Sequence, residues 1–245
     1  MAITQKWKDT VNQGVSDARW DAYDELVKKQ IAAFNQRFSS TPNYAQVDWL
    51  YIKAMLWIES GGPDNASWKT RPMQIGNPGD PAFSVLKEGK EGSLLVMEPA
   101  VQQALKAGRI NDPEINIKAG IAYLFTRLAK FANKSAPDPR DSKVYEHTVA
   151  KGDSLWSIAN AKGTTLEELN ARNPGTTAHL KPGQVLKYTK TKMELTIVGW
   201  RGFTAQEIAQ RYNVGDPDYS AKITYLMKDV FPKLNRPAPD AGIRK

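Results

Sequence analysis

The sequence predicts an α+β fold, in which a mainly helical domain is interrupted by a small βααβ module. Apolar residues recur at helical spacing before residue 133 and again after residue 204, with strand and turn signals between them. The chain has 245 residues, of which 41% are hydrophobic and 24% charged, so it can bury a sizeable core. We expect residues 1–140 and 190–245 to form the two parts of the helical domain, and residues 144–189 to form the module.

Two amphipathic helices are predicted in the first 60 residues. The first carries apolar residues spaced by three and four, and it ends at Ser39–Pro42: Trp20, Tyr23, Val27, Ile31, Phe34 and Phe38. In the second, Thr41 would cap a helix that has Pro42 at its first position and ends at Gly61-Gly62-Pro63. Its apolar face comprises Val47, Leu50, Tyr51, Ala54, Met55 and Ile58, with Glu59 at the edge.

A third helix follows a stretch of loops and short helical pieces over residues 63–110. Asp112 is its predicted cap, Pro113 lies in its first turn, and its buried stripe is Ile117, Ile121, Leu124, Leu128 and Phe131. The Pro- and Ser-containing stretch Lys134–Ser142 is then predicted to be a linker.

The module is predicted to run strand, helix, helix, strand. Its strands are expected at Tyr145–Val149 and Gln184–Tyr188, and Ser154 and Thr165 would cap its two helices. Beyond it we expect a strand over Met193–Val198, a helix over Ala205–Tyr212, and a final helix that begins near Asp216-Pro217. The apolar face of that last helix would carry Ile223, Leu226, Met227 and Val230.

The charge balance favours an anionic partner. The chain carries 34 Lys and Arg against 26 Asp and Glu, a net charge of +8, and no run of five basic residues. We therefore expect no dedicated nucleic-acid arm. The absence of cysteine excludes disulfides and zinc–thiolate sites, and with only two histidines we expect neither a metal site nor a cofactor.

The module resembles LysM, a small domain that binds peptidoglycan and chitin. The matching segments are His147–Val149, Gly152–Ala159, Leu166–Asn170, Asn173-Pro174 and Leu180–Gln184. The resemblance implies ligand contacts from the loop after the first strand, and from the stretch between the second helix and the second strand. The implied glycan-binding residues are Gly152, Asp153, Ser154, Asn173, Pro174 and Gly175. We expect Leu155 and Trp156 to pack in the module rather than to bind ligand.

Four further motifs, in order and type, resemble those of soluble lytic transglycosylases and goose-type lysozymes. They are Glu59-Ser60 at a helix end, Met73-Gln74, Asn116 with Ala119-Gly120, and Tyr212-Asn213. The last motif follows the module and the others precede it, so the resemblance implies a lysozyme-like catalytic domain split by an inserted LysM. The alternative is a catalytic domain that ends near Asn133, followed by a separate small helical region. Arg71-Pro72 stands where the family usually has Gly-Leu, which leaves the shape of the groove floor open.

Glu59 is the candidate catalytic residue. It ends an apolar run, and both apolar surroundings and a helix C-terminus favour its protonated form, so it can act as a general acid. The resemblance implies cleavage of the MurNAc–GlcNAc β-1,4 bond of peptidoglycan, which leaves 1,6-anhydroMurNAc ends. Ser60, Gln74 and Asn213 would hydrogen-bond the sugars, and Tyr212 would position Glu59 or stack on a sugar. Met73 would pack under the groove, and Asn116 is either a groove residue or a helix-start residue.

Two other functions stay open. A lysozyme-like muramidase of the same fold would need a second carboxylate, roughly 6.5–9.5 Å from the acid in inverting enzymes, and Asp64 and Asp80 are the local candidates. Reducing ends instead of anhydro ends would distinguish this glycosidase from a lyase. The third possibility is a wall-binding protein without catalysis.

The amino-terminal stretch MAITQKWKDTVNQG has no apolar core of signal-peptide length, and no segment has 18 consecutive apolar residues. We expect synthesis in the cytoplasm, no membrane span, and action in the periplasm or cell wall after non-classical delivery. A bacteriolytic secreted effector or a phage lysin fits this expectation. Its partners would be peptidoglycan glycan strands, a delivery machinery and, in a producing cell, a cognate inhibitor.

Overall fold

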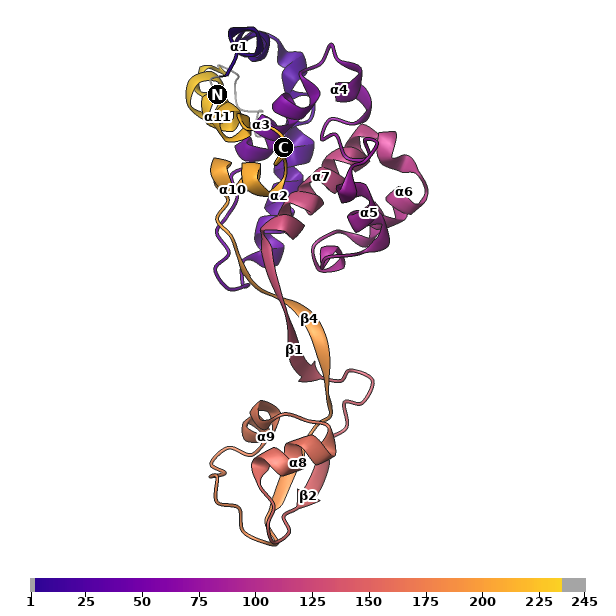
Figure 1. Ribbon diagram of the computed structural model, residues 1–245, viewed down its shortest axis with the longest axis vertical. Helices are drawn as coiled ribbons and strands as arrows, with labels where there is room; N and C mark the ends of the chain where they lie inside the picture. The colour runs from indigo at the N-terminus through magenta and orange to yellow at the C-terminus, as the bar shows by residue number, and fades with distance from the viewer. Residues whose placement is uncertain (1–2, 235–245) are drawn as a thin grey trace, which may run out of the picture. The chain divides into compact units, whose positions relative to one another are not determined.

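The structure is a computed structural model that describes residues 3–234, and it divides into two compact units (Figure 1). The first, called the helical unit below, contains the chain up to Lys130 and again from Ile197. The second, called the insert unit, contains Phe131–Thr196. The α+β class predicted from the sequence is confirmed.

Nine α-helices of the described chain lie in the helical unit. They are α1 (Gln5–Asn12), α2 (Asp24–Phe38), α3 (Leu50–Ser60), α4 (Ala66–Thr70), α5 (Pro81–Glu88), α6 (Pro99–Lys106), α7 (Pro113–Leu128), α10 (Ala205–Arg211) and α11 (Tyr219–Tyr225). Short 3₁₀ segments connect some of them, at Gln13–Val15, Ala18–Asp21, Ser93–Leu95 and Arg109–Asn111. A π-helical turn, Leu226–Val230, and a 3₁₀ turn, Phe231–Lys233, follow α11.

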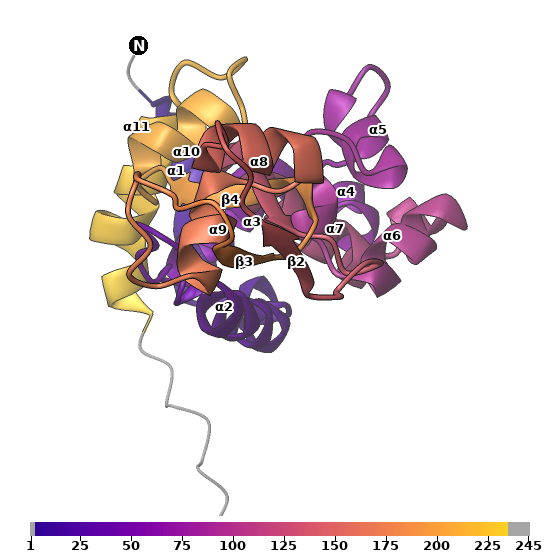
Figure 2. The ribbon, with the colours of Figure 1, turned by 90° about the horizontal axis from the view of Figure 1, so that it is seen from below.

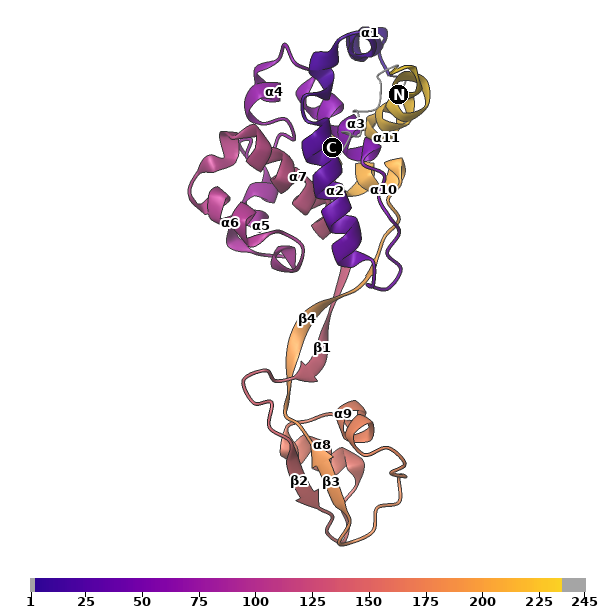
Figure 3. The same cartoon turned by 180° about the vertical axis from the view of Figure 1, so that it is seen from behind.

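Helices α3 and α7 are the most buried and form the centre of the helical unit. Helices α5, α6 and α10 pack on α7, and α11 packs on α3 (Figures 1 and 3). Segments from both ends of the chain therefore meet around α3 and α7. The Asp112 side chain accepts hydrogen bonds from two backbone amides and Pro113 opens α7, which confirms the predicted start of the third helix.

The predicted start of the second helix is wrong. Helix α3 begins at Leu50 instead of Pro42 because side chains of α2 take up the polar groups of the intervening segment. Asn35 accepts from the Val47 amide at 2.9 Å and from the Tyr44 hydroxyl at 2.7 Å. Thr41 donates its hydroxyl to the Phe38 carbonyl at 2.6 Å, so it does not cap a following helix. The segment is thus fixed by tertiary hydrogen bonds instead of helical ones.

The predicted linker is also partly wrong, because its first residues belong to a strand. Strand β1 (Ala129–Pro137) pairs with β4 (Thr191–Trp200) in a two-stranded sheet. The Arg201 amide bonds the Leu128 carbonyl at 2.9 Å near one end, and the Asp138 amide bonds the Lys190 carbonyl at 2.9 Å at the other. These two bonds show that the strands are antiparallel. Phe131, expected on the buried face of the preceding helix, lies in β1 instead.

The module has the predicted order of elements. They are β2 (Tyr145–Thr148), α8 (Leu155–Lys162), α9 (Leu166–Arg172) and β3 (Val185–Tyr188). The strands are antiparallel, with Tyr145 opposite Tyr188 and Thr148 opposite Val185. Both helices cover one face of this sheet (Figures 2 and 3). Ser154 and Thr165 cap them as predicted.

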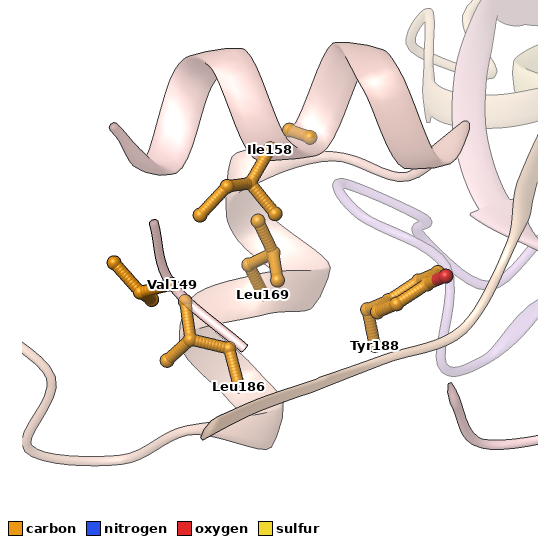
Figure 4. Packing of buried hydrophobic residues seen from close by; sticks show 6 residues of the cluster. Val149, Ile158, Leu169, Leu186 and Tyr188 are labelled. Atoms are coloured by element: carbon orange, nitrogen blue, oxygen red, sulfur yellow. The ribbon is translucent and has the colours of Figure 1, made fainter. Parts of the chain in front are cut away.

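The core of the module is small and continuous. Its buried side chains come from both helices, from β3 and from Val149 directly after β2, and five of them are Val149, Ile158, Leu169, Leu186 and Tyr188 (Figure 4). Leu155 packs against this cluster as expected. The expectation for Trp156 is wrong, because this side chain is 67% exposed on α8. It follows the helix cap and points away from the core, since Leu155 and Ile158 occupy the buried face.

Candidate functional site

Glu59 lies in the last turn of α3 and is partly buried. Gly61 ends the helix in the left-handed conformation, with φ of 69°, which turns the chain away directly after this residue. Most side chains of the preceding turns of α3 are apolar, and Ala54, Met55, Leu56 and Trp57 are almost fully buried. One carboxylate oxygen, Oε1, accepts a hydrogen bond from the Tyr219 hydroxyl at 2.7 Å and a longer one from Asn213 Nδ2 at 3.4 Å.

The surroundings raise the pKa of Glu59. Burial is the main cause, because it disfavours the charged form, and the negative charges of Asp216 and Asp80 act in the same direction. The hydrogen bonds from Tyr219 and Asn213 oppose the shift without cancelling it. Glu59 therefore keeps its proton to a higher pH than an ordinary glutamate, which is the property that a general acid needs.

A cavity of about 230 Å³ opens beside Glu59 and combines residues from distant parts of the sequence. Its lining is Glu59, Met73, Gln74, Ile75, Asn77, Asp80, Ala82, Tyr123, Tyr212 and Asn213. Five of the seven residues singled out from the four motifs are in this set: Glu59, Met73, Gln74, Tyr212 and Asn213. The other two, Ser60 and Asn116, are absent from it.

Ser60 is a buried residue that serves the helix end. Its side chain donates to the Leu56 carbonyl at 2.5 Å and accepts from the Gly62 amide at 3.2 Å, and the residue is only 4% exposed. The expected hydrogen bond from Ser60 to a sugar is therefore wrong, because both of its polar functions are used inside the protein.

Asn116 is fully buried in the first turns of α7 and supports the floor of the cavity. Its Oδ1 accepts from the Met73 amide at 2.9 Å, and its Nδ2 donates to the carbonyls of Ile75 and Ile110 at 2.9 and 3.2 Å. Asn116 is 0% exposed, so the expectation of a substrate contact from it is wrong. Its amide fixes the loop that carries Met73 and Gln74.

That loop has a strained backbone at the cavity. Gln74 adopts a left-handed conformation with φ of 57°, which is uncommon for residues other than glycine. Asn77 donates to its side-chain carbonyl at 2.7 Å, and Arg71 donates to the Gly76 carbonyl at 3.0 Å. Arg71 therefore braces the loop that presents Gln74.

Tyr219, and not Tyr212 as expected from the sequence, positions Glu59. The Tyr212 hydroxyl donates to the Met73 carbonyl at 2.9 Å and its ring packs edge-on against Tyr123, so it does not hold Glu59. Tyr219, which is 0% exposed, holds it instead. Tyr219 was not identified from the sequence. Its spacing from Ile223 marks it as a core position, and no sequence pattern indicates what its hydroxyl contacts.

Of the two candidate second carboxylates, only Asp80 lines the cavity. Its two oxygens accept from the amides of Gly76 and Ala82, both at 2.8 Å, and the second of these bonds caps α5. The Asp64 side chain is 75% exposed and pairs with Arg19 at 2.7 Å. Asp64 is therefore no longer a candidate for the second carboxylate beside Glu59.

A second cavity, of about 290 Å³, adjoins the first and shares Asn213 as a wall. Its other lining residues come from α10, α11 and the turn between them: Gln206, Ala209, Gln210, Val214, Asp216, Pro217 and Ser220. This set holds the side-chain amides of Gln206 and Gln210, the Asp216 carboxylate, the Ser220 hydroxyl and three small apolar residues. Such a surface suits hydroxyl and acetamido groups of a sugar.

In the insert unit, the implied glycan-binding residues divide into two groups. Asp153 accepts from the Ala150 amide and contacts His147 Nε2, both at 2.8 Å, and these contacts lower its pKa. Asn173 is bonded to the Leu169 carbonyl and to both backbone groups of Lys187. Pro174 and Gly175 line a cavity of about 390 Å³, whereas Gly152, Asp153 and Ser154 lie outside its lining.

Residues 3–234 contain neither a metal-binding cluster nor a membrane-spanning helix. This part of the chain holds no group of three or more His, Asp or Glu side chains placed to hold a metal ion. It also holds no helix with the length and apolar character that crossing a bilayer requires.

Comparison with known proteins finds a match for the module and for no other part of the chain. The family model of the LysM domain matches residues 147–189, which supports a peptidoglycan-binding module. No curated protein and no solved structure matches the chain.

Proposed function

We propose that the protein is a peptidoglycan lytic transglycosylase that cleaves the MurNAc–GlcNAc β-1,4 bond through Glu59 and binds the wall through its LysM module. The lysozyme-like character of the helical unit is part of this proposal. Peptidoglycan as substrate puts the activity in the bacterial periplasm or cell wall. Delivery machinery and a cognate inhibitor are further partners that such an enzyme would need.

The observation that carries the proposal is the environment of Glu59. A carboxyl group with a raised pKa faces a cavity, and its side-chain hydrogen-bond partners within residues 3–234 are the neutral groups of Tyr219 and Asn213. Within the described part of the chain, no lysine or arginine forms an ion pair with it. A carboxyl placed in this way is poorly suited to an ion pair and well suited to donating a proton.

The chemistry follows from this arrangement. Glu59 would protonate the glycosidic oxygen as the C1–O bond breaks and positive charge develops on the sugar. The C6 hydroxyl of the same MurNAc then attacks C1 and returns its proton to Glu59, so a single carboxyl closes the cycle. Tyr219 holds Oε1, which leaves the other oxygen free to carry the transferred proton.

The cavity residues would bind the sugars on either side of the broken bond. Gln74 and Asn213 offer amide groups at the cavity wall, and the second cavity continues past Asn213 along α10. Together the two hollows suit a chain of sugars better than a single small molecule. The LysM module would raise the local concentration of glycan around this cleft.

A hydrolase of the same design is the second candidate, and the position of Asp80 favours it. A second carboxylate in the same cavity could activate a water molecule. Its two backbone hydrogen bonds give Asp80 a structural task in the apo protein as well.

Digestion of purified peptidoglycan tests the proposal, with the products identified by mass spectrometry. Wild type should release 1,6-anhydromuramoyl ends, Glu59→Gln should lose at least about a hundredfold in rate, and Asp80→Asn should retain activity. Asp64→Asn is the matched control, because it makes the same change at an exposed carboxylate outside the cavity. Reducing-end products that vanish in Asp80→Asn would establish the hydrolase. An inactive wild type that still binds sacculi would establish a wall-binding protein.

A further inference from the structure

The cavity of the insert unit is built by one loop that joins α9 to β3. Its lining is Pro174, Gly175, Thr176, Thr177, His179, Lys181 and Gln184, and its volume is about 390 Å³. Both ends of this loop are fixed to the module. The Asn173 side chain bonds Lys187 of β3 from one end, and at the other end Val149 bonds the backbone of Gly183 and Gln184 at 2.8 Å.

The lining carries basic groups and no acidic one. Within residues 3–234, the Lys181 ammonium and the His179 imidazole have no ion pair and no hydrogen bond. Elsewhere in the insert unit, Lys190 pairs with Asp141 and Lys192 pairs with Glu194, whereas Lys151, Lys162 and Lys187 have no ion pair among the described residues. What distinguishes Lys181 and His179 is that both line one cavity whose lining holds no carboxylate.

Neutral donors surround these basic groups. The Lys181 backbone amide donates to Gln184 Oε1 at 3.2 Å. The side-chain NH₂ of Gln184 takes no part in this bond and can donate to a ligand. The Thr176 hydroxyl lies in the same lining, whereas the Thr177 hydroxyl already donates to the His179 carbonyl at 3.3 Å. A carboxylate accepts hydrogen bonds from all three kinds of group, and charge assistance from Lys181 would strengthen its binding.

We propose that this cavity binds a carboxylate carried by muramic acid residues, and that the module thereby selects peptidoglycan over chitin. Chitin is a polymer of neutral N-acetylglucosamine, whereas each muramic acid bears a lactyl group that ends in a carboxylate or in a stem peptide with carboxylates of its own. The inference rests on the glycan binding in the proposed function and is independent of catalysis by Glu59.

The test measures binding by full-length Glu59→Gln protein, in which cleavage is suppressed, with ¹⁵N NMR to report on residues 174–184 separately from the helical unit. The probes are a GlcNAc tetrasaccharide, a peptide-free GlcNAc–MurNAc tetrasaccharide, the same glycan with its lactyl carboxyl reduced to an alcohol, and a peptide-bearing glycan. Lys181→Gln and His179→Gln remove the basic groups. Lys187→Gln is the matched control, since Lys187 is an exposed residue of the same module outside the cavity.

A muramyl glycan should shift the loop resonances and bind about tenfold more tightly than the GlcNAc tetrasaccharide, and about 0.5 M salt should reduce this preference. Lys181→Gln should abolish the preference and Lys187→Gln should keep it. A preference that survives with the peptide-free glycan assigns the lactyl carboxylate, and one seen only with the peptide-bearing glycan assigns the stem peptide.

Equal affinity for all four probes would overturn the inference while leaving glycan binding intact. An equal loss in Lys187→Gln and Lys181→Gln would overturn it as well, because the effect would then be one of overall charge. Failure of every probe and of whole sacculi to bind would overturn both this inference and the binding part of the proposed function.

Discussion

At the scale of the residue, the environment of each polar side chain decides its role. Glu59 and Ser60 are neighbours in sequence, yet Glu59 faces a cavity, whereas the Ser60 hydroxyl hydrogen-bonds the backbone at the helix end. Asn116 carries the same amide as Asn213, but it is sealed under the cavity floor. The sequence predicted a catalytic acid at Glu59 and sugar contacts for Ser60 and Asn213, and it left Asn116 open between a groove residue and a helix-start residue. Burial separates these residues.

The raised pKa of Glu59 predicts a pH-dependent cost to stability. In the unfolded chain the residue has an ordinary pKa of about 4.3, and in the folded protein its pKa is higher. Between these two pH values the native state binds more protons than the unfolded state does. Wild type should therefore lose stability relative to Glu59→Gln as the pH rises through this interval. Below the unfolded pKa the carboxyl is protonated in both states, and the difference should vanish.

Thermal melting between about pH 4 and pH 8 measures this difference. Glu59→Gln should melt higher than wild type at about pH 8, by a margin that narrows toward about pH 4. Glu25→Gln is the control for the change in net charge, because the Glu25 side chain is 78% exposed, and its effect should stay within about 0.5 kcal/mol. A wild type that is the more stable protein at about pH 8 would contradict the burial of Glu59.

At the scale of the element, close approach of α7 to the loop of Met73 and Gln74 shapes the site. A Cβ added at Gly120 would lie 2.6 Å from Met73 Cβ and 2.8 Å from Met73 Cγ. Glycine is therefore required at this point of the helix for steric reasons. The same contact holds the Met73 carbonyl at the position where Tyr212 donates to it.

Gly120→Ala should destabilise the protein by about 1–3 kcal/mol, although alanine is the better helix former. The nearest atom is Met73 Cβ, which cannot move without the backbone, so the steric cost should exceed the gain in helix propensity. Urea unfolding measures the change. Gly202→Ala is the control, since its new Cβ would meet nothing closer than 3.7 Å. A stabilised Gly120→Ala protein would show that α7 and the loop are not tightly packed.

At the scale of the whole molecule, the insert unit enters and leaves through paired strands. β1 and β4 form one antiparallel pair, and the Asp138 amide bonds the Lys190 carbonyl at 2.9 Å where the pair ends. The chain therefore returns to the point from which it departed. An insertion with neighbouring ends can be removed without stretching the chain on either side.

Replacing residues 139–189 by Asn-Gly should give a hairpin that closes β1 onto β4 and leaves the helical unit folded. The variant should melt cooperatively and lose binding to sacculi in a sedimentation assay. If the proposed activity holds, its cleavage of sacculi should fall at least about tenfold while its cleavage of soluble glycan fragments persists. The soluble fragments are the internal control. An unfolded variant would show that the helical unit depends on the insert.

Sequence alone determined the features that depend on neighbours along the chain. Helical periodicity, the caps Asp112, Ser154 and Thr165, and the order of the LysM elements are local, and the structure confirms them. The apolar run ending at Glu59 likewise predicted a partly buried carboxyl. The start of α3 and the extent of β1 escaped prediction, because Asn35 and β4 supply the hydrogen bonds that decide them.

Tertiary structure alone decided which polar groups meet. Tyr219 reaches Glu59 across 160 positions of sequence, and Tyr212 reaches Met73 across 139. Hydrogen-bond partners at such separations depend on how whole helices pack, and an apolar period marks a residue as buried without saying what its hydroxyl contacts. For the same reason only the structure shows that Asp80, and not the other candidate Asp64, lines the cavity of Glu59, and that the basic groups of the module's loop share one cavity.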